Sequence, residues 1–297
     1  MRHLLDAAVS KRNALSFPGT DALRLIDGEG DGLPGLELET FAGKWLLSTR
    51  DRTPGPAVLE WLRDQQRTVY WKQLDQHQKE SPRWVAGPEQ EAPFPVRESG
   101  LAFEISFQSG YSQGIFLDQH DNRAGVRERM RPGMTLLNTF SYTGAFSVFA
   151  AAGGATTTTL DLAQPYLDWA KRNFVLNDLD PARHYFCKGD TFHWLQRFAK
   201  QGRKFDAIVL DPPTFSRDQD GTVFRVEKDY GRLAALAFSC LAPGGWLLAC
   251  TNCRQLPPAA FEKQIRAVST KALKIRHAPM PADFTAEPYL KSLWVET

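Results

Sequence analysis

The sequence lacks long apolar runs and has few cysteines, and both features restrict the class of protein. In 297 residues no apolar run approaches the roughly 18 residues that a membrane span needs. The N-terminus has an early acid and no long apolar stretch, so we expect no signal peptide. The 4 cysteines lack the paired Cys-x-x-Cys spacing of a structural zinc site, and the single Cys250-x-x-Cys253 is interpreted as a strand end and its loop. We therefore predict a reduced, cytoplasmic protein without a membrane or metal partner.

An excess of charge of one sign is also missing. The chain has 36 Lys and Arg against 34 Asp and Glu, a net charge of +2 and a pI near 8.3. This balance does not require a nucleic-acid partner, but it permits one that binds a local basic face. The apolar fraction of 42% and charged fraction of 24% are typical of globular proteins, and the length suits one large or two modest domains.

The first part of the chain has the pattern of a small β-rich module. Short β-branched and aromatic segments alternate there with Gly, Pro and Asp turn signals. Helices are expected over 1–16 and 57–66, whereas 73–93 is polar and is expected to form mostly exposed loop. The expected strands lie at 22–26, 36–39, 45–49, 68–72, 83–85 and 94–107. We predict an α+β, β-rich N-terminal domain over residues 1–107.

The second part, residues 108–297, changes to an alternation of strands and helices. Strands are expected at 135–140, 156–161, 184–188, 207–211, 246–250 and 292–296. Helices are expected at 144–152, 164–176, 191–200, 230–241 and 258–270. Such alternation builds a mostly parallel sheet with helices on both faces, so we predict an α/β, Rossmann-like domain.

The most informative segment is Asp-Ala-Ile-Val-Leu-Asp-Pro-Pro-Thr-Phe-Ser-Arg, at residues 206–217. Its apolar, β-branched start predicts a buried strand that ends at the carboxylate of Asp211. Pro212 and Pro213 fix φ and remove two backbone donors, so the chain leaves the sheet as a stiff, extended lip. Loops at the carboxyl ends of parallel strands bind ligands in open α/β sheets. The lip offers acceptors for a nucleobase edge, and Phe215 either stacks on the base or fills the core.

Acids at the ends of consecutive strands indicate a cofactor site. The loop at 138–147 passes from strand to helix through Gly144, which allows close backbone approach beside the free N–H groups of a helix start. The loop is not GxGxxG, which disfavours a dinucleotide. Asp161 ends the next strand, where an acid accepts hydrogen bonds from ribose hydroxyls. Asp190 follows the third strand and either holds an adenine amino group or caps the helix that begins at Thr191.

These features look like the class I S-adenosylmethionine-dependent methyltransferase fold. More narrowly, residues 20–297 resemble the bacterial family of large-subunit ribosomal-RNA methyltransferases that includes cytosine-C5 and guanine-N7 enzymes. The matching motifs are Asp31-Gly-Leu-Pro-Gly35, Gly114-Ile-Phe-Leu-Asp-Gln-His-Asp-Asn-Arg123, Phe140-Ser-Tyr-Thr-Gly-Ala-Phe146, Asp211-Pro-Pro-Thr-Phe-Ser216 and Tyr289-Leu-Lys-Ser-Leu-Trp294.

The resemblance implies roles for particular residues. It implies that Phe116, Asp118 and Arg123 approach the methionine end of S-adenosylmethionine, and that Asp161 and Asp190 take the adenosine. It further implies that the lip lines the target-base pocket, with Asp211, Pro212, Pro213 and Phe215 as catalytic positions. The remaining cofactor contacts that it implies are Ser141, Tyr142, Gly144, Phe146, Leu162, Thr191 and Asp211 itself.

The residue after the last central strand distinguishes two reactions. Methylation of cytosine C5 requires a thiolate that adds to C6 of the ring. The C5 enzymes carry that cysteine where this chain has Asn252, and guanine-N7 members carry Asn there. Cys253 is one residue away, and on a continuing strand it points to the other side, so we interpret it as a structural thiol. Guanine N7 is therefore favoured over cytosine C5.

Other readings of the sequence stay open at this point. The target is expected to be RNA, with large-subunit ribosomal RNA implied by the resemblance. Because the RNA-binding domain of many C5 members is missing from the start of this chain, we expect the N-terminal module, the sheet face or a second chain to contact the RNA. Some relatives are dimeric, which implies a homodimer. The alternatives are a methyltransferase acting on a small molecule or a protein, and a non-catalytic module that binds the cofactor and RNA.

Overall fold

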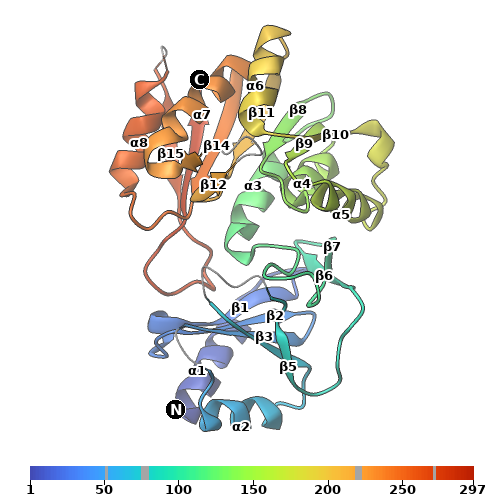
Figure 1. Ribbon diagram of the computed structural model, residues 1–297, viewed down its shortest axis with the longest axis vertical. Helices are drawn as coiled ribbons and strands as arrows, with labels where there is room; N and C mark the ends of the chain where they lie inside the picture. Colours follow the sequence, from blue (N-terminus) through green and yellow to red (C-terminus); the bar gives the residue numbers. More distant parts are fainter. Residues whose placement is uncertain (51–52, 75–79, 218–222, 270–271) are drawn as a thin grey trace. The chain divides into compact units, whose positions relative to one another are not determined.

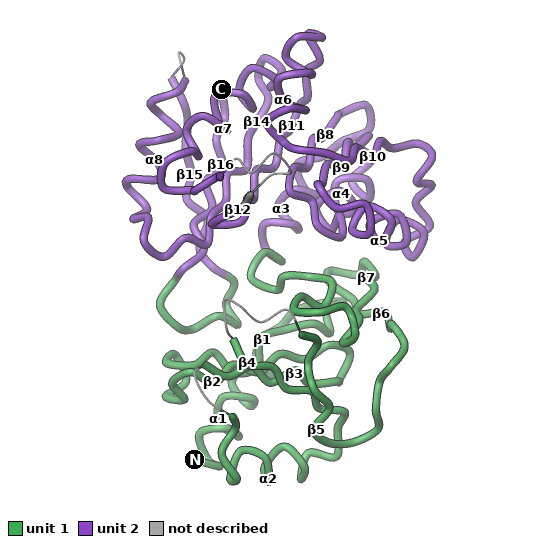
Figure 2. Tube along the Cα trace, viewed as in Figure 1, with its two compact units in different colours: residues 1–120, 281–288 green, residues 121–280, 289–297 purple. Residues whose placement is uncertain are grey.

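The computed structural model describes residues 1–50, 53–74, 80–217, 223–269 and 272–297. The chain divides into two compact units (Figure 2). Unit 1 comprises Met1–His120 and Pro281–Pro288, and unit 2 comprises Asp121–Met280 and Tyr289–Thr297. The first unit is thus longer than the stretch 1–107 suggested by the sequence, and it includes a segment from near the C-terminus.

Unit 1 is built on a five-stranded sheet with the order β1-β2-β3-β4-β5. Neighbours pair antiparallel except β3 and β4, which are parallel and are connected through helix α2. A separate hairpin is formed by β6 and β7. The bounds are α1 Arg2–Asn13, β1 Ala22–Asp27, β2 Leu36–Phe41, β3 Lys44–Thr49, α2 Pro56–Asp64, β4 Val69–Gln73, β5 Arg83–Ala86, β6 Phe94–Glu98 and β7 Leu101–Ile105.

The prediction of one strand over 94–107 is wrong, because the chain reverses between β6 and β7. Ser99 and Gly100 both have left-handed backbone angles, φ 49° and 82°, which make the tight turn. The other expected strands of this unit correspond to β1 to β5. Within the polar stretch 73–93, residues 75–79 lie outside the described part of the chain.

Hydrogen bonds explain why residues 281–288 belong to unit 1. The Asp283 carboxylate accepts from the Arg24 backbone N–H at 2.9 Å and lies 3.0 Å from Nε2 of His120. The backbone N–H groups of Thr285 and Ala286 both donate to the Asp27 carboxylate at 2.7 Å. These partners are about 160 to 260 residues apart in sequence, so local patterns do not reveal them.

Unit 2 is a seven-stranded sheet with the order β10-β9-β8-β11-β14-β16-β15 (Figure 1). The first five of these strands are parallel, and β16 is antiparallel to both β14 and β15. This is the predicted Rossmann-like sheet. The strands are β8 Thr135–Thr139, β9 Thr156–Asp161, β10 Tyr185–Lys188, β11 Phe205–Leu210, β14 Leu241–Thr251, β15 Lys274–Ala278 and β16 Lys291–Glu296.

Alternate residues of the central strands face two different apolar clusters. Leu137, Ile208 and Leu247 belong to a cluster that contains residues of α6, α7 and α8. Their neighbours Leu136 and Ala207 belong to another, which contains residues of α3 and α4. Helices therefore cover both faces of the sheet, as predicted. The helices are α3 His120–Arg129, α4 Ala145–Ala152, α5 Gln164–Val175, α6 Thr191–Lys200, α7 Val226–Cys240 and α8 Pro258–Ala267.

Some elements of unit 2 differ from the expected ones. Helix α7 begins at Val226 rather than at residue 230, and its first turn carries Glu227 and Asp229, which favour a helix N-terminus. The strand β15 and the short hairpin of β12 (Phe215–Arg217) and β13 (Val223–Arg225) were not predicted. Residue 270, at the end of the helix expected over 258–270, lies outside the described residues.

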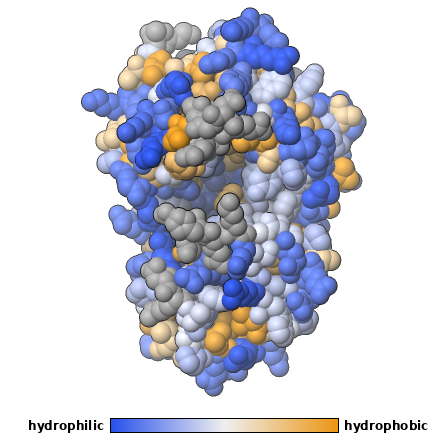
Figure 3. Space-filling model, in the orientation of Figure 1, coloured by the Kyte–Doolittle hydropathy of each residue, from blue (hydrophilic) through white to orange (hydrophobic). Residues whose placement is uncertain are grey.

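The described helices and one face of the surface can be examined for long apolar stretches. Among the described residues, no helix is both long and apolar enough to cross a bilayer. On the face drawn in Figure 3, hydrophilic side chains predominate and the apolar ones form small, separate groups.

Candidate cofactor and base-binding site

The predicted site residues of unit 2 follow the carboxyl ends of its parallel strands. Asp161 is the last residue of β9, Asp190 is two residues beyond β10, and Asp211 directly follows β11. Leu210, at the end of β11, pairs with Thr139 of β8 on one side and with Ala249 of β14 on the other. The loops after these strands therefore emerge at one edge of the sheet, where α/β folds bind ligands.

The loop between β8 and α4, residues 140–144, is held by hydrogen bonds along its length. The N–H of Ser141 donates to the Leu160 carbonyl at 3.0 Å, and the N–H of Tyr142 donates to the Asp161 carboxylate at 2.8 Å. Nδ2 of Asn173, on α5, donates to the Thr143 carbonyl at 2.9 Å. This network holds a costly backbone, because Phe140 and Tyr142 have φ of 50° and 48°, which costs about 1–3 kcal/mol at each non-glycine residue.

Gly144 has a packing role that the sequence did not indicate. A Cβ atom at this position would lie 2.6 Å from Cβ of Ala170 on α5, and φ is +76°. Gly144 is therefore required by packing against α5, and its contact with the cofactor stays a prediction. Gly144 also precedes α4, whose first N–H groups have no side-chain cap.

Asp161 supports this loop as well as ending β9. Its two carboxylate oxygens accept from the N–H groups of Tyr142 at 2.8 Å and Ala163 at 2.9 Å. Burial raises the pKa of Asp161, while these backbone hydrogen bonds act in the opposite direction. A carboxylate can accept about four hydrogen bonds, so Asp161 can also accept a ribose hydroxyl.

Asp190 is a helix cap, one of the two roles expected for it. Its Oδ1 accepts from the N–H of His193 at 3.0 Å, at the start of α6. Thr191, the first residue of α6, is buried, whereas Leu162 is exposed after β9. A contact of these residues with adenosine stays a prediction.

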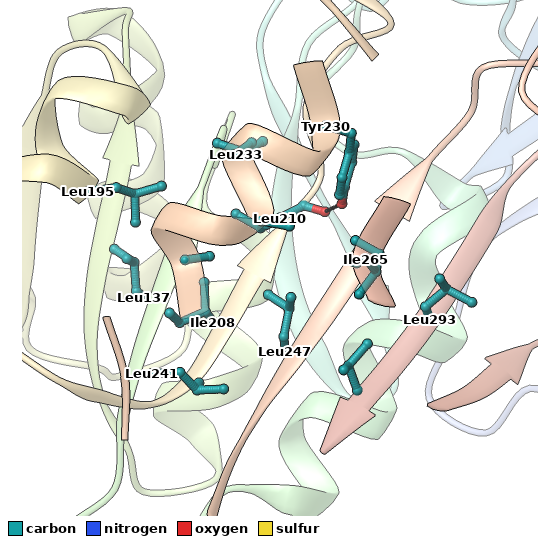
Figure 4. Packing of buried hydrophobic residues seen from close by; sticks show 14 of the residues in the cluster. Leu137, Leu195, Ile208, Leu210, Tyr230, Leu233, Leu241, Leu247, Ile265 and Leu293 are labelled. Carbon is teal, nitrogen blue, oxygen red and sulfur yellow. Dashed lines mark hydrogen bonds between the residues drawn. The ribbon is translucent and has the colours of Figure 1, made fainter. Parts of the chain in front are cut away.

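Helix α7 holds the lip, residues 211–215, by hydrogen bonds at both of its ends. The buried hydroxyl of Tyr230 donates to the carbonyl of Leu210 at 3.0 Å, immediately before the lip (Figure 4). The N–H of Val226 donates to the carbonyl of Thr214 at 3.2 Å. Phe215 is 51% exposed, so the alternative that it fills the core is wrong. Pro212 is buried and Pro213 is exposed, so the lip has an anchored start and an exposed outer part.

Asn252 lies beside the lip and is bonded to it. It directly follows β14, the neighbour of β11 in the sheet. The Thr214 hydroxyl donates to Oδ1 of Asn252 at 2.8 Å. The sequence identified Asn252 only through the family pattern. The sequence did not reveal its hydrogen bond with Thr214, because the two residues are 38 apart and follow different strands.

The two nearby thiols are buried. Cys253 is 1% exposed, and its Sγ donates to Oε1 of Glu227 at 3.3 Å. Burial raises the pKa of the Cys253 thiol, and the hydrogen bond to Glu227 acts in the same direction. Cys250 belongs to the apolar cluster that contains residues of α3 and α4, on the other face of the sheet. Its Sγ lies 3.6 Å from the Ser292 hydroxyl. Because the thiolate is the reactive form, these surroundings suit structural thiols.

The remaining predicted cofactor residues are divided between the units. Phe116, exposed, and Asp118 belong to unit 1, where Leu117–Gln119 forms a 3-10 helix. Arg123 belongs to α3 of unit 2, is buried, and has its guanidinium 5.8 Å from the centre of the Phe146 ring. Contact between these residues and the methionine end of a cofactor stays a prediction.

The loop after β8 offers groups that fit the polar parts of S-adenosylmethionine. Within the described residues, the buried Oγ of Ser141 has no hydrogen-bond partner. Ser141 belongs to the loop that leads to the uncapped start of α4, and the N–H of the next residue, Tyr142, donates to Asp161. A hydroxyl, free N–H groups and a carboxylate suit the amino-acid and ribose groups of this cofactor. No group of three His, Cys, Asp or Glu in the described part of the chain could hold a metal ion.

Comparison with known proteins agrees with this chemistry. Residues 43–287 match the model of a family described as S-adenosylmethionine-dependent methyltransferases. A ribosomal RNA large subunit methyltransferase of Deinococcus radiodurans is 33% identical over 325 residues, covering 98% of this chain and 78% of that protein. Ribosomal RNA large subunit methyltransferase K of Neisseria meningitidis is 41% identical over 163 residues, covering 54% of this chain and 46% of its own. A crystal structure of a methyltransferase complexed with SAH matches 100% of this chain and 80% of its own, with a TM-score of 0.90 and 28% identity.

Proposed function

The chain belongs to the family of S-adenosylmethionine-dependent methyltransferases, and on this premise we propose that it methylates N7 of a guanine in large-subunit ribosomal RNA. The RNA substrate is supported by relatives that match most of this chain and are named ribosomal RNA large subunit methyltransferases. The choice of base is supported by the site itself.

The observation that supports guanine N7 as the methylated atom is the exposure and hydrogen bonding of the residues at the end of β14. Asn252 is exposed there, while Cys253 and Cys250 are buried and hydrogen-bonded. A C5 mechanism needs a thiolate that reaches C6 of cytosine. Burial raises the pKa of the Cys253 thiol, so the thiolate that this step requires is disfavoured. N7 of guanine has an in-plane lone pair and needs neither a nucleophile nor a general base.

The chain's own residues then have to bind, orient and balance charge. S-adenosylmethionine supplies a methyl group on a positively charged sulfur. Ser141, Asp161 and the start of α4 would hold the cofactor, and the lip would hold the base. Placing the two reactants in line can lower the barrier by roughly 7–11 kcal/mol. The carboxylate of Asp211 and the carbonyls of the lip would stabilise the positive charge that moves to the base.

Phe215 would supply a stacking surface for an extruded base. Its ring is exposed, and the guanidinium of Arg225 lies 5.6 Å from the ring centre. Flipping a base out of a duplex costs a few kcal/mol, and stacking on an aromatic ring returns about 1–3 kcal/mol. RNA contact through the N-terminal unit and a homodimer stay predictions.

The test is nucleoside mass spectrometry of protein-free, unmodified large-subunit ribosomal RNA incubated with the protein and methyl-deuterated S-adenosylmethionine. Labelled 7-methylguanosine is the expected product, and it should persist in Cys250→Ser and Cys253→Ser. Labelled 5-methylcytidine that disappears in Cys253→Ser would overturn the choice of base. No label in RNA from a protein that still binds SAH would overturn the proposal of naked ribosomal RNA as substrate.

A further inference from the structure

The hydrogen bond between Thr214 and Asn252 fixes one end of an exposed amide. The Thr214 hydroxyl donates to Oδ1 at 2.8 Å, so the amide oxygen is engaged. Nδ2 has no hydrogen-bond partner among the residues that the structure describes, and the Asn252 side chain is exposed. The amide thus presents a donor at the site where the base is proposed to bind.

Further hydrogen bonds hold the backbone at Thr214 and just after Asn252. The carbonyl of Thr214 accepts from the N–H of Val226 at 3.2 Å, which ties the lip to the start of α7. After Asn252, the N–H of Cys253 donates to the Thr251 hydroxyl at 3.2 Å, and the Cys253 carbonyl accepts from Nζ of Lys291 at 2.8 Å. The amide is therefore fixed from both sides, which gives its donor a defined direction.

The bases differ in whether the exocyclic group beside the methylated atom accepts or donates a hydrogen bond. Guanine N7 is flanked by O6, a hydrogen-bond acceptor, whereas adenine N7 is flanked by the N6 amino group, a donor. Cytosine C5 is flanked by the N4 amino group, also a donor. A fixed N–H donor beside the reacting atom pairs with guanine and opposes the two amino-bearing bases.

We propose that Asn252, oriented by Thr214, is the residue that selects guanine by donating from Nδ2 to O6 of the target base. Thr214 is a positioning residue, because it acts through the amide. This inference rests on the proposed guanine-N7 function and adds how the enzyme rejects the other bases.

The test compares variants on the same RNA by the rate of 7-methylguanosine formation. Asn252→Ala removes the donor and should lower kcat/KM roughly 10-fold, the effect of one specific hydrogen bond to a base. Asn252→Asp replaces the donor by an acceptor that repels O6, so the loss should be larger. Thr214→Val should cause a smaller loss, because the amide is still present but can turn. Gln201→Glu, an exposed amide-to-acid change after α6, is the matched control and should leave the rate unchanged.

A substrate analogue separates selection from a structural effect. Once the methylated guanosine is mapped, RNA can be ligated with 2-aminopurine at that position, which keeps N7 but lacks O6. The unaltered enzyme should lose roughly 10-fold on this RNA, whereas Asn252→Ala should methylate both RNAs at similar rates. SAH affinity, measured by calorimetry, should be the same in all variants.

Two outcomes distinguish failure of this inference from failure of the proposed function. If the unaltered protein forms no 7-methylguanosine, the proposed function fails, and the selection of guanine fails with it. If 7-methylguanosine forms but Asn252→Ala and Asn252→Asp retain the full rate, only the inference about Asn252 is overturned. The inference would also be overturned if Asn252→Ala, compared with the unaltered enzyme, lowered the rate by the same factor on guanine RNA and on 2-aminopurine RNA.

Discussion

Glycine at position 144 is required for two physical reasons that can be measured separately. In Gly144→Ala the new Cβ would lie 2.6 Å from Cβ of Ala170, far inside van der Waals contact. Overpacking of this kind costs about 1–3 kcal/mol. A left-handed backbone at φ +76° costs alanine about 1–2 kcal/mol more. We therefore expect the free energy of unfolding to fall by about 2–5 kcal/mol.

A second substitution removes only the steric part. Ala170→Gly deletes the atom that the new Cβ would meet, but by itself it costs about 1 kcal/mol because glycine is a poor helix former. The double variant Gly144→Ala/Ala170→Gly keeps the backbone strain and loses the clash. Its destabilisation should therefore be smaller than the sum of the two single effects by about 1–3 kcal/mol.

Urea unfolding followed by tryptophan fluorescence measures all four proteins, and calorimetric titration with SAH reports on the loop at 140–144. The alanine side chain in Gly144→Ala forces α4 and α5 apart. This variant should therefore also weaken SAH binding. The reasoning is refuted if Gly144→Ala unfolds within about 0.5 kcal/mol of the parent, the range of neutral surface changes. It is also refuted if the two single effects simply add.

Three further predictions concern groups that support the site. Tyr230→Phe leaves the buried Leu210 carbonyl without its donor, so urea unfolding should show a loss of about 1–3 kcal/mol. Asp161→Asn faces an amide N–H against the N–H of Tyr142 or Ala163, so calorimetry should show SAH binding weakened by about 10-fold or more. Burial lowers the pKa of His184 below its ordinary value of 6.5, so the unfolded chain takes up the proton first as the pH falls. The free energy of unfolding should therefore decrease below pH 6.5, and His184→Gln should decrease less; an equal decrease in both proteins would contradict this assignment.

The sequence predicted best those elements whose local signals agree with one another. The helix expected over 191–200 is α6 with the same bounds, because Asp190 caps it and its apolar residues recur at helical spacing. The strand expected over 156–161 is β9, and it ends at the predicted acid. Strand β15, Lys-Ile-Arg-His-Ala, was missed because it is an edge strand with mostly charged and exposed residues.

The candidate site could be predicted as a set of positions but not as a set of contacts. Strand ends are visible in the sequence because each apolar run stops at a polar residue, as at Asp161 and Asp211. The hydrogen bonds that give these positions their roles join distant parts of the chain. Asn173 and Thr143 are 30 residues apart, and Thr214 and Asn252 are 38 apart. No local pattern specifies such pairs, because only the packing of helices and strands brings them together.

The two halves of the site are made rigid in different ways, and this suits the division of labour between them. The loop at 140–144, which is proposed to hold the cofactor, leads into α4. There Nδ2 of Asn138 and the Thr159 hydroxyl both donate to Oγ of Ser147, at 3.0 and 2.9 Å, in a buried polar network. Such fully buried bonds fix a single arrangement, which suits a cofactor of constant shape. The lip is held by hydrogen bonds from α7, while the Phe215 ring and the Asn252 amide beside it are exposed. If the lip holds the target base as proposed, a base paired within a duplex has to be extruded first, and weakly paired target nucleotides are then favoured because they cost less to flip.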